Sequence, residues 1–331
     1  MISFSYTRVD DVATAVREIA SSGAARFIAG GTNLIDLMKE NVERPNRLID
    51  ITHLPLGDIR PGADGGLRLG ALVTNSEAAY NEEVERRYPL LSRAFLSGAS
   101  PQLRNVATVG GNLLQRTRCC YFYDIATRCN KREPGAGCSA RKGLNRAHAI
   151  LGTSGHCIAV HPSDMCVALA ALEAVVHVIG PKGERSIPIG DFHRLPGDTP
   201  HLETNLGPDE IITAVDLPKK GFARNHCYLK IRDRAAFAFS LVSVAAALEM
   251  EGERISEVRI ALGGVAHKPW RDRNAEALLL GRRPDAQNFR KAADALLKDA
   301  QAFAHNGFKI ELARRAIVRA LGLAAAGEDR S

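Results

Sequence analysis

Residues 118–138, RCCYFYDIATRCNKREPGAGC, constrain the fold more than any other stretch of this chain. They contain four cysteines and a fifth follows at Cys157, so five of the seven cysteines lie within 39 residues. The stretch has no apolar run long enough for a strand. An odd number of unevenly clustered cysteines fits a metal site better than a disulfide framework. We therefore expect a long loop that is organised by its thiols.

Positive charge is concentrated in the same region. The chain has a net charge of +7, and residues 116–146 hold eight Lys or Arg against two acidic residues, a surplus of six. Aromatic residues are only 5% of the chain, which argues against the stacking platforms of single-strand-binding proteins. The charge therefore belongs to one local site, where it could offset a negatively charged cluster or bind an acidic partner subunit.

The rest of the composition is that of a globular protein, with 45% hydrophobic and 24% charged residues. No apolar stretch approaches the roughly 20 residues that span a bilayer. The first residues lack the basic and apolar regions of an export signal. We expect two or three domains, located in the cytoplasm or exported to the periplasm with a signal-bearing partner.

Regular structure is predicted on both sides of the cysteine segment. A helix at 10–22 lies between short strands in a first α/β unit, and strands followed by helices from about residue 223 indicate a separate α+β domain. The predicted boundaries are 1–55, 56–222 with an insertion at about 113–160, 223–325, and a disordered tail at 326–331.

Two glycine loops carry the first functional signal. Residues 29–33, AGGTN, connect a predicted strand to a helix, where backbone N–H groups can converge on a phosphate. A second loop, TVGGN, covers residues 108–112, and HPSDM places Asp164 at the start of a helix. Neither loop is a GxGxxG or P-loop motif. Each could equally be a tight turn, and Asp164 a helix cap.

Four motifs in order give a family resemblance. AGGTNLIDLM, RNVATVGGNL, HPSDM and YLKIRDR, the last followed by FSLVSVAAAL, resemble the FAD-binding subunit of the xanthine dehydrogenase family of molybdenum hydroxylases. The resemblance implies an α+β chain with a two-part FAD-binding domain of the vanillyl-alcohol-oxidase type and a C-terminal α+β flavoprotein domain. The flavin-binding residues that it implies are Ala29, Gly30, Gly31, Thr32, Asn33, Leu34, Thr108, Gly110, Gly111, Asn112, Asp164, Ile212 and Lys230.

The cysteine spacing matches neither a zinc ribbon nor a bacterial ferredoxin. It is similar to the insertion of the FAD subunits of periplasmic aldehyde oxidoreductases and, more distantly, of benzoyl-CoA reductases. That resemblance implies a [4Fe–4S] cluster held by Cys119, Cys129, Cys138 and Cys157. Cys120 is the alternative to Cys119. We expect buried structural thiols at Cys166 and Cys227, and hydrogen-bonding roles near the flavin or cluster for His156 and His161.

The resemblance implies an electron-transfer subunit without a catalytic residue of its own. It would form a heterotrimer with a [2Fe–2S] small subunit and a molybdenum-cofactor large subunit, which would oxidise an aldehyde or a xanthine-type substrate. Electrons would leave through FAD to an external acceptor. Two alternatives are a stand-alone flavin oxidase with its own small substrate and a zinc-stabilised nucleic-acid-binding module.

Overall fold

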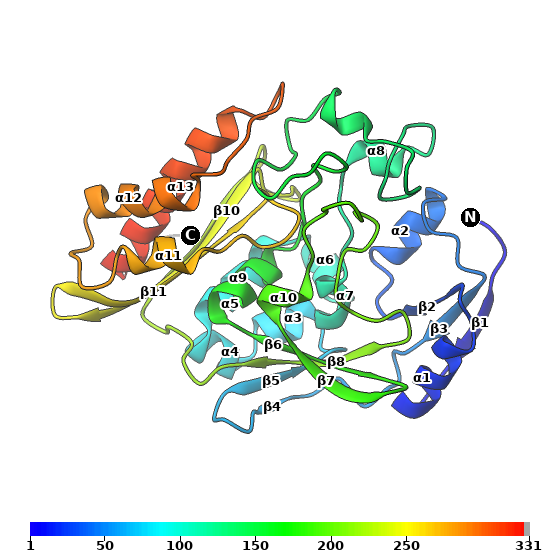
Figure 1. Ribbon diagram of the computed structural model, residues 1–331. Helices are drawn as coiled ribbons and strands as arrows, with labels where there is room; N and C mark the ends of the chain where they lie inside the picture. Colours follow the sequence, from blue (N-terminus) through cyan, green and yellow to red (C-terminus); the bar gives the residue numbers. More distant parts are fainter. Residues whose placement is uncertain (328–331) are drawn as a thin grey trace.

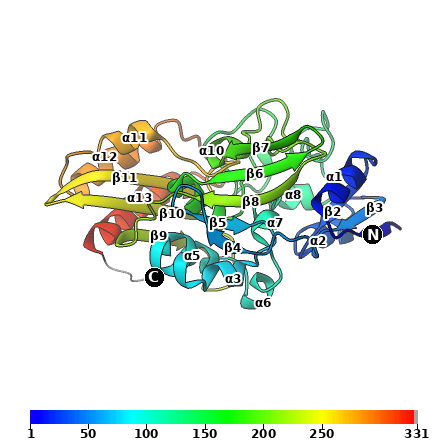
Figure 2. The ribbon, with the colours of Figure 1, turned by 90° about the horizontal axis from the view of Figure 1, so that it is seen from below.

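The computed structural model describes residues 1–327 and contains three β-sheets that follow one another across the molecule (Figures 1 and 2). A three-stranded parallel sheet lies at the N-terminal end, a five-stranded antiparallel sheet in the middle, and a three-stranded antiparallel sheet at the C-terminal end. Within the described residues, no helix is long and apolar enough to cross a membrane.

The N-terminal unit is a small α/β layer. It contains β1 (Ser5–Arg8), α1 (Val12–Ala20), β2 (Ala25–Ile28), α2 (Leu34–Lys39) and β3 (Arg47–Asp50), with strand order β1-β3-β2. Asp11 caps α1 by accepting the N–H of Thr14, and α1 buries Ala15, Val16 and Ile19 against the sheet. This geometry leaves the β2–α2 connection, which is the first glycine loop, at one edge of the unit (Figure 1).

The middle sheet has the strand order β4-β5-β8-β6-β7. Its strands are β4 (Ile59–Pro61), β5 (Leu67–Gly70), β6 (Val175–Gly180), β7 (Gly183–Pro188) and β8 (Ile211–Leu217). The helices of this region are α3 (Asn75–Ala79), α4 (Glu82–Arg87), α5 (Pro89–Ser97), α6 (Pro101–Arg104), α7 (Val109–Leu113), α9 (Asp164–Leu172) and α10 (Ile189–Phe192). The predicted capping box of Thr74 and Glu77 is present at the start of α3.

The cysteine segment contains little regular structure, as the sequence predicts. It has only α8 (Cys120–Tyr123) and the 3-10 turn η1 (Ser139–Arg141). Phe122 and Cys129 pack on Leu37 of α2, so the segment lies over the end of the N-terminal unit (Figure 1). This contact places Cys129 beside α2, the helix that follows the first glycine loop.

The C-terminal sheet has the order β11-β10-β9, as three successive antiparallel strands. Its elements are β9 (Asn225–Ile231), β10 (Val242–Glu251), β11 (Arg254–Gly263), α11 (Arg273–Ala277), α12 (Ala286–Leu296) and α13 (Phe308–Ala326). Residue 326 ends α13, and residues 328–331 of the predicted tail lie outside the described residues.

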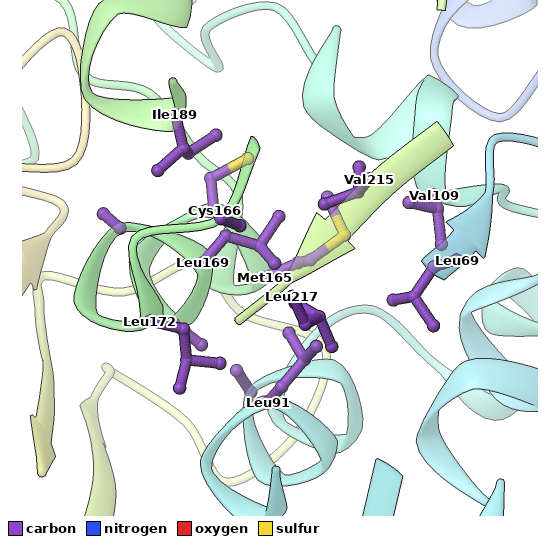
Figure 3. Packing of buried hydrophobic residues seen from close by; sticks show 14 of the residues in the cluster. Leu69, Leu91, Val109, Met165, Cys166, Leu169, Leu172, Ile189, Val215 and Leu217 are labelled. Carbon is purple, nitrogen blue, oxygen red and sulfur yellow. The ribbon is translucent and has the colours of Figure 1, made fainter. Parts of the chain in front are cut away.

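The main hydrophobic core crosses the predicted boundary at residue 222. All nine residues of α9 are buried, as expected for a helix that is apolar on every side. The helix contributes Leu169 and Leu172 to a hydrophobic cluster that also contains Leu69 and Val215 of the middle sheet (Figure 3). The same cluster includes Ala245 and other residues of the C-terminal strands. The two regions therefore share one core.

Candidate functional site

A cavity of about 1220 Å³ is lined by segments from all three sheet-containing regions. Most of the predicted flavin-binding residues line it, although they come from distant parts of the sequence. Those in the wall are Ala29, Gly30, Gly31, Thr32, Asn33, Leu34, Thr108, Gly111, Asn112, Asp164 and Lys230. The fold therefore brings both glycine loops, the HPSDM motif and the strand of Lys230 to one space.

Gly30 of the first glycine loop contacts the segment that leads into the second glycine loop. A Cβ atom at this position would lie 2.0 Å from the carbonyl oxygen of Val106, which belongs to the backbone and cannot move away freely. Gly31 has a φ of 69°, a conformation that side chains rarely adopt. Glycine at these two positions therefore lets residues 29–34 pack against the segment that precedes Thr108.

Asparagine side chains organise the cavity wall. Asn33 accepts the backbone N–H of Arg116 at 2.9 Å, while its own Nδ2 is buried without a hydrogen-bond partner within residues 1–327. Asn112 accepts the hydroxyl of Ser163 at 2.7 Å, and Ser163 caps the helix that begins with Asp164. The second glycine loop is thereby tied to the HPSDM motif, and Asn33 keeps a donor for an anionic or hydroxyl ligand.

Two predicted flavin residues do not line the cavity. Gly110 packs on Ala71, the residue after β5: its N–H donates to the Ala71 carbonyl at 2.8 Å, and an added Cβ would lie 3.1 Å from that oxygen. Ile212 is 5% exposed and belongs to the core beneath β8. Both residues support the wall from behind.

A buried ion pair joins two of the predicted residues. The Lys230 ammonium lies 2.7 Å from the Asp164 carboxylate, with side chains 5% and 6% exposed. Tyr228 donates its hydroxyl to the other carboxylate oxygen at 2.6 Å. Burial and the adjacent Asp164 carboxylate raise the pKa of Tyr228 well above its usual value, so this hydroxyl remains a donor. Asp164 therefore does not present a free carboxylate to the cavity.

His161 and His193 stand together in the cavity wall with ring centroids 4.2 Å apart. His161 Nε2 and His193 Nδ1 are solvent-excluded and have no hydrogen-bond partner in the described part of the chain. Burial lowers the pKa of His193 to about 4 and that of His161 well below its usual value, so both rings are neutral at pH 7. Neutral imidazoles at this position can bond a cofactor or an ordered water.

A second, smaller cavity lies within the cysteine segment. It is lined by all four predicted ligands, Cys119, Cys129, Cys138 and Cys157, and by His156. Residues 129 and 138 also pair as an isolated β-bridge. Cys120 is exposed and does not line this space. The folded loop therefore gathers four thiols that lie up to 38 positions apart in the sequence.

The thiols are arranged more widely than the ligands of one zinc ion. No three of these four sulfurs lie within 4.8 Å of one another in the described residues. Four sulfurs at about 2.3 Å from a tetrahedral zinc would be about 3.8 Å apart. Burial raises the pKa of Cys119 to about 12 and that of Cys157 to about 11, so both are protonated unless a metal displaces the proton.

Thr117 lines both cavities, so they share a wall. Lys131, from the cysteine cavity, places its ammonium 2.6 Å from the carboxylate of Glu203, which lines the larger cavity. The same ammonium lies 2.5 Å from Nε2 of His267 and donates to the carbonyl of Pro200 at 2.9 Å. A continuous set of polar contacts therefore connects the two spaces.

Four of the eight basic residues in 116–146 pair with acidic residues from outside this stretch. The ion pairs are Arg116 with Glu43 and Glu203, Arg118 with Asp36, Lys131 with Glu203, and Arg146 with Asp233. Two further guanidinium groups, Arg132 and Arg141, donate to backbone carbonyls. Much of the surplus therefore fastens the segment to its surroundings.

Replacing Lys131 by Met is expected to destabilise the protein by about 3 kcal/mol, because it leaves a largely buried carboxylate with one cation fewer. Burial alone would raise the pKa of Glu203, but Lys131 and Arg116 lower it to about 2. This stabilisation is complete above the unfolded pKa of about 4.5 and is lost as the pH falls towards 2. Denaturant unfolding from pH 7 to 3 should show the Lys131→Met deficit shrinking with acid. Exposed Lys142→Met is the control, and equal stability of the two variants would contradict the prediction.

No local pattern predicted several residues of the site. Glu203 forms an ion pair with Lys131, 72 positions away in the sequence. Tyr228, on β9, donates its hydroxyl to Asp164. Nε2 of His148 lies 3.1 Å from the sulfur of Cys119. Each of these residues is ordinary in its local sequence. Only the folded chain brings them to the predicted ligands.

Comparison with family models gives two matches that cover most of the chain. Residues 2–220 match the FAD binding domain in molybdopterin dehydrogenase, and residues 227–324 match the CO dehydrogenase flavoprotein C-terminal domain. Residues 221–226 separate the two matches.

Individual relatives agree with these models. The chain is 51% identical to the aldehyde oxidoreductase FAD-binding subunit PaoB of Escherichia coli, over 98% of this chain and 99% of that protein. It is 27% identical to the glyceraldehyde dehydrogenase medium chain of Sulfolobus acidocaldarius, over 89% and 85%. Among solved structures, carbon monoxide dehydrogenase from Hydrogenophaga pseudoflava superposes with a TM-score of 0.77 at 26% identity, covering 99% of both chains.

Proposed function

Because this chain belongs to the family of FAD-binding medium subunits of molybdenum hydroxylases, we propose that it carries FAD and a [4Fe–4S] cluster in its two adjoining cavities. The family confirms the predicted fold of an FAD-binding domain followed by a C-terminal flavoprotein domain. It also confirms the prediction of an oxidoreductase subunit.

Two features of the larger cavity support the proposal that it binds FAD: its shape and the unpaired Nδ2 donor of Asn33. Residues 29–34 bring backbone N–H groups to the cavity because Gly30 and Gly31 carry no side chain. Asn33 Nδ2 would bond the pyrophosphate or a hydroxyl, and Thr108 keeps the second loop in place by accepting the N–H of Gly111 at 3.2 Å. Bound FAD accepts two electrons and can release them one at a time.

Replacing Lys230 by Met is expected to lower the reduction potential of bound FAD, because a cation beside the ring favours the anionic reduced flavin. The same change leaves buried Asp164 without its cation and should cost about 3 kcal/mol of stability. Spectroscopic redox titration and denaturant unfolding measure the two effects. Exposed Lys219→Met is the control. A FAD potential that does not change in the Lys230 variant would exclude Lys230 from the flavin environment.

The convergence of four thiols is the observation that carries the cluster proposal. Cys119, Cys129, Cys138 and Cys157 would each ligate one iron, and thiolate ligation is typical of [4Fe–4S] centres. The sulfurs are too widely spaced for a single tetrahedral zinc, which weakens the nucleic-acid-binding alternative. The paired cations of the segment weaken it further, because they are already neutralised within the chain.

We infer that electrons pass between the cluster and the flavin across the shared wall. Thr117 lines both cavities, and Lys131 bonds residues of the flavin cavity from the cluster side. Rapid-freeze spectroscopy of the complex with aldehyde tests this role. Reduction of the cluster on the time scale of turnover supports it, whereas a cluster that stays oxidised while FAD is reduced contradicts it.

We further propose that the subunit works in a heterotrimer with a [2Fe–2S] small subunit and a molybdenum-cofactor large subunit. The similarity to an FAD-binding subunit of an aldehyde oxidoreductase supports an aldehyde as the substrate of the complex. The isolated chain is expected to oxidise no aldehyde, and the complex is expected to do so with an added electron acceptor. Turnover by the isolated chain would instead support a stand-alone flavin oxidase.

We propose that the complex lies in the periplasm, exported with a signal-bearing partner, or else in the cytoplasm. Cell fractionation with antibodies to this chain distinguishes the two compartments. Deletion of any export signal on a partner should retain both proteins in the cytoplasm if they are exported together.

A further inference from the structure

One side chain outside the four thiols approaches a proposed cluster ligand directly. His148 Nε2 lies 3.1 Å from the sulfur of Cys119, within hydrogen-bonding distance. His148 is 6% exposed, so water does not compete for this contact. We propose that His148 donates an N–H···S hydrogen bond to Cys119 and thereby raises the reduction potential of the cluster. This inference rests on the cluster assigned under the proposed function.

The surroundings of the ring favour the tautomer that donates to sulfur. A ligating thiolate accepts hydrogen bonds, so the proton belongs on the nitrogen that faces it. The other nitrogen, Nδ1, is buried without a partner within the described residues. A buried nitrogen lone pair without a donor is tolerated better than a buried N–H without an acceptor. The contact with Cys119 therefore fixes Nε2 as the protonated atom.

Two residues of the C-terminal region and the nearby Asn145 hold the backbone of His148 in position. Its carbonyl accepts Lys309 Nζ at 2.8 Å and Asn306 Nδ2 at 3.3 Å, and its N–H donates to Asn145 at 3.0 Å. Lys309, Asn306 and Asn145 are each 0% exposed. The ring of Tyr121 lies 6.4 Å from the imidazole. A donor fixed in this way needs no reorganisation when the charge of the cluster changes.

This contact also distinguishes Cys119 from the adjacent Cys120. Cys119 receives the histidine and lines the thiol cavity, whereas Cys120 is exposed and does neither. A second sulfur of the set, Cys157, receives only the backbone N–H of Ala159 at 3.4 Å. His148 is therefore the one side-chain donor to these four sulfurs among the bonds found in residues 1–327.

A hydrogen bond to a ligating sulfur stabilises the more negative, reduced cluster, and such bonds are among the features that set iron–sulfur potentials. Loss of the bond should change the equilibrium between the oxidised and reduced cluster about tenfold. For a one-electron couple this corresponds to a midpoint about 59 mV lower. His148 is thus a positioning and tuning residue, not a ligand.

The test is an EPR-monitored redox titration of the assembled complex. His148→Leu, which removes the donor, should lower the cluster midpoint by about 59 mV, whereas His148→Gln, which keeps an amide N–H, should recover part of the shift. Exposed His53→Leu is the matched control and should leave the midpoint unchanged. A cluster that assembles in His148→Leu with the wild-type midpoint would overturn this inference but leave the cluster proposal standing.

A second measurement on the wild-type complex covers the case in which His148→Leu does not assemble. Besides the proton on the backbone N–H of Ala159, which donates to Cys157, ENDOR spectra of the reduced cluster in H2O should contain a second strongly coupled proton that long exchange into D2O removes. Its absence overturns the hydrogen bond. Absence of iron from the wild-type chain would instead overturn the proposed function itself.

Discussion

Replacing Cys129 by Ser is expected to remove nearly all iron and acid-labile sulfide of the proposed cluster while leaving FAD bound. Cys129 is 8% exposed, lines the thiol cavity and faces the other thiols, with Cys138 as its partner in a β-bridge. Serine has almost the same size, but its oxygen is a poor ligand for iron in a sulfur-ligated cluster. Loss of iron and sulfide from this variant would therefore indicate the loss of a ligand, not a change in packing.

The neighbouring Cys120→Ser variant is the matched control, because Cys120 is exposed and lies outside the cavity. Iron, sulfide and flavin are measured in the same anaerobic preparation of each variant. Loss of the cluster from Cys120→Ser with retention in Cys119→Ser would reverse the assignment of the first ligand. A full complement of sulfide in Cys129→Ser would contradict the four-thiol site.

Replacing Gly30 by Ala should produce the largest loss of flavin. A Cβ here would lie 2.0 Å from the Val106 oxygen and 2.7 Å from its carbonyl carbon, so the loop of residues 29–34 must separate from the segment that leads to Thr108. Overpacking of this kind costs about 1–3 kcal/mol. If that cost falls on the flavin-bound form, FAD binding weakens by roughly 5- to 150-fold.

Gly23→Ala is the control for this variant. Gly23 has no atom within 4 Å of an added Cβ and lies in the turn before β2. Fluorescence titration of the apoprotein with FAD gives both dissociation constants. Equal affinity in the two variants would show that the first glycine loop does not hold the pyrophosphate.

Local signals predicted many of the helices and strands. The glycine loop between β2 and α2 was readable because turn chemistry is local, and the three C-terminal strands were readable from their apolar runs. The four thiols could be selected by spacing and resemblance, and the fold gathers those four around one cavity while leaving Cys120 outside. These predictions depend on residues that act near their own place in the sequence.

The remaining features depend on contacts between distant segments. β8 enters the middle sheet between β5 and β6, after the whole cysteine segment has intervened, and no local pattern specifies that position. Ile212 has the apolar character of a flavin contact, but its strand turns it into the core. The basic residues of the segment were predicted to offset a cluster or to bind an acidic partner subunit. The structure instead pairs several of them with acidic residues such as Glu43 and Asp233, which lie far away in the sequence of this chain.

The central claim is that one chain holds both FAD and a [4Fe–4S] cluster. Flavin, metal and sulfide analysis of the full-length chain, purified without oxygen, tests it most directly. We predict one FAD, four iron atoms and four acid-labile sulfides per chain, with zinc at background level. Flavin without iron and sulfide, or one zinc ion in their place, would contradict the account.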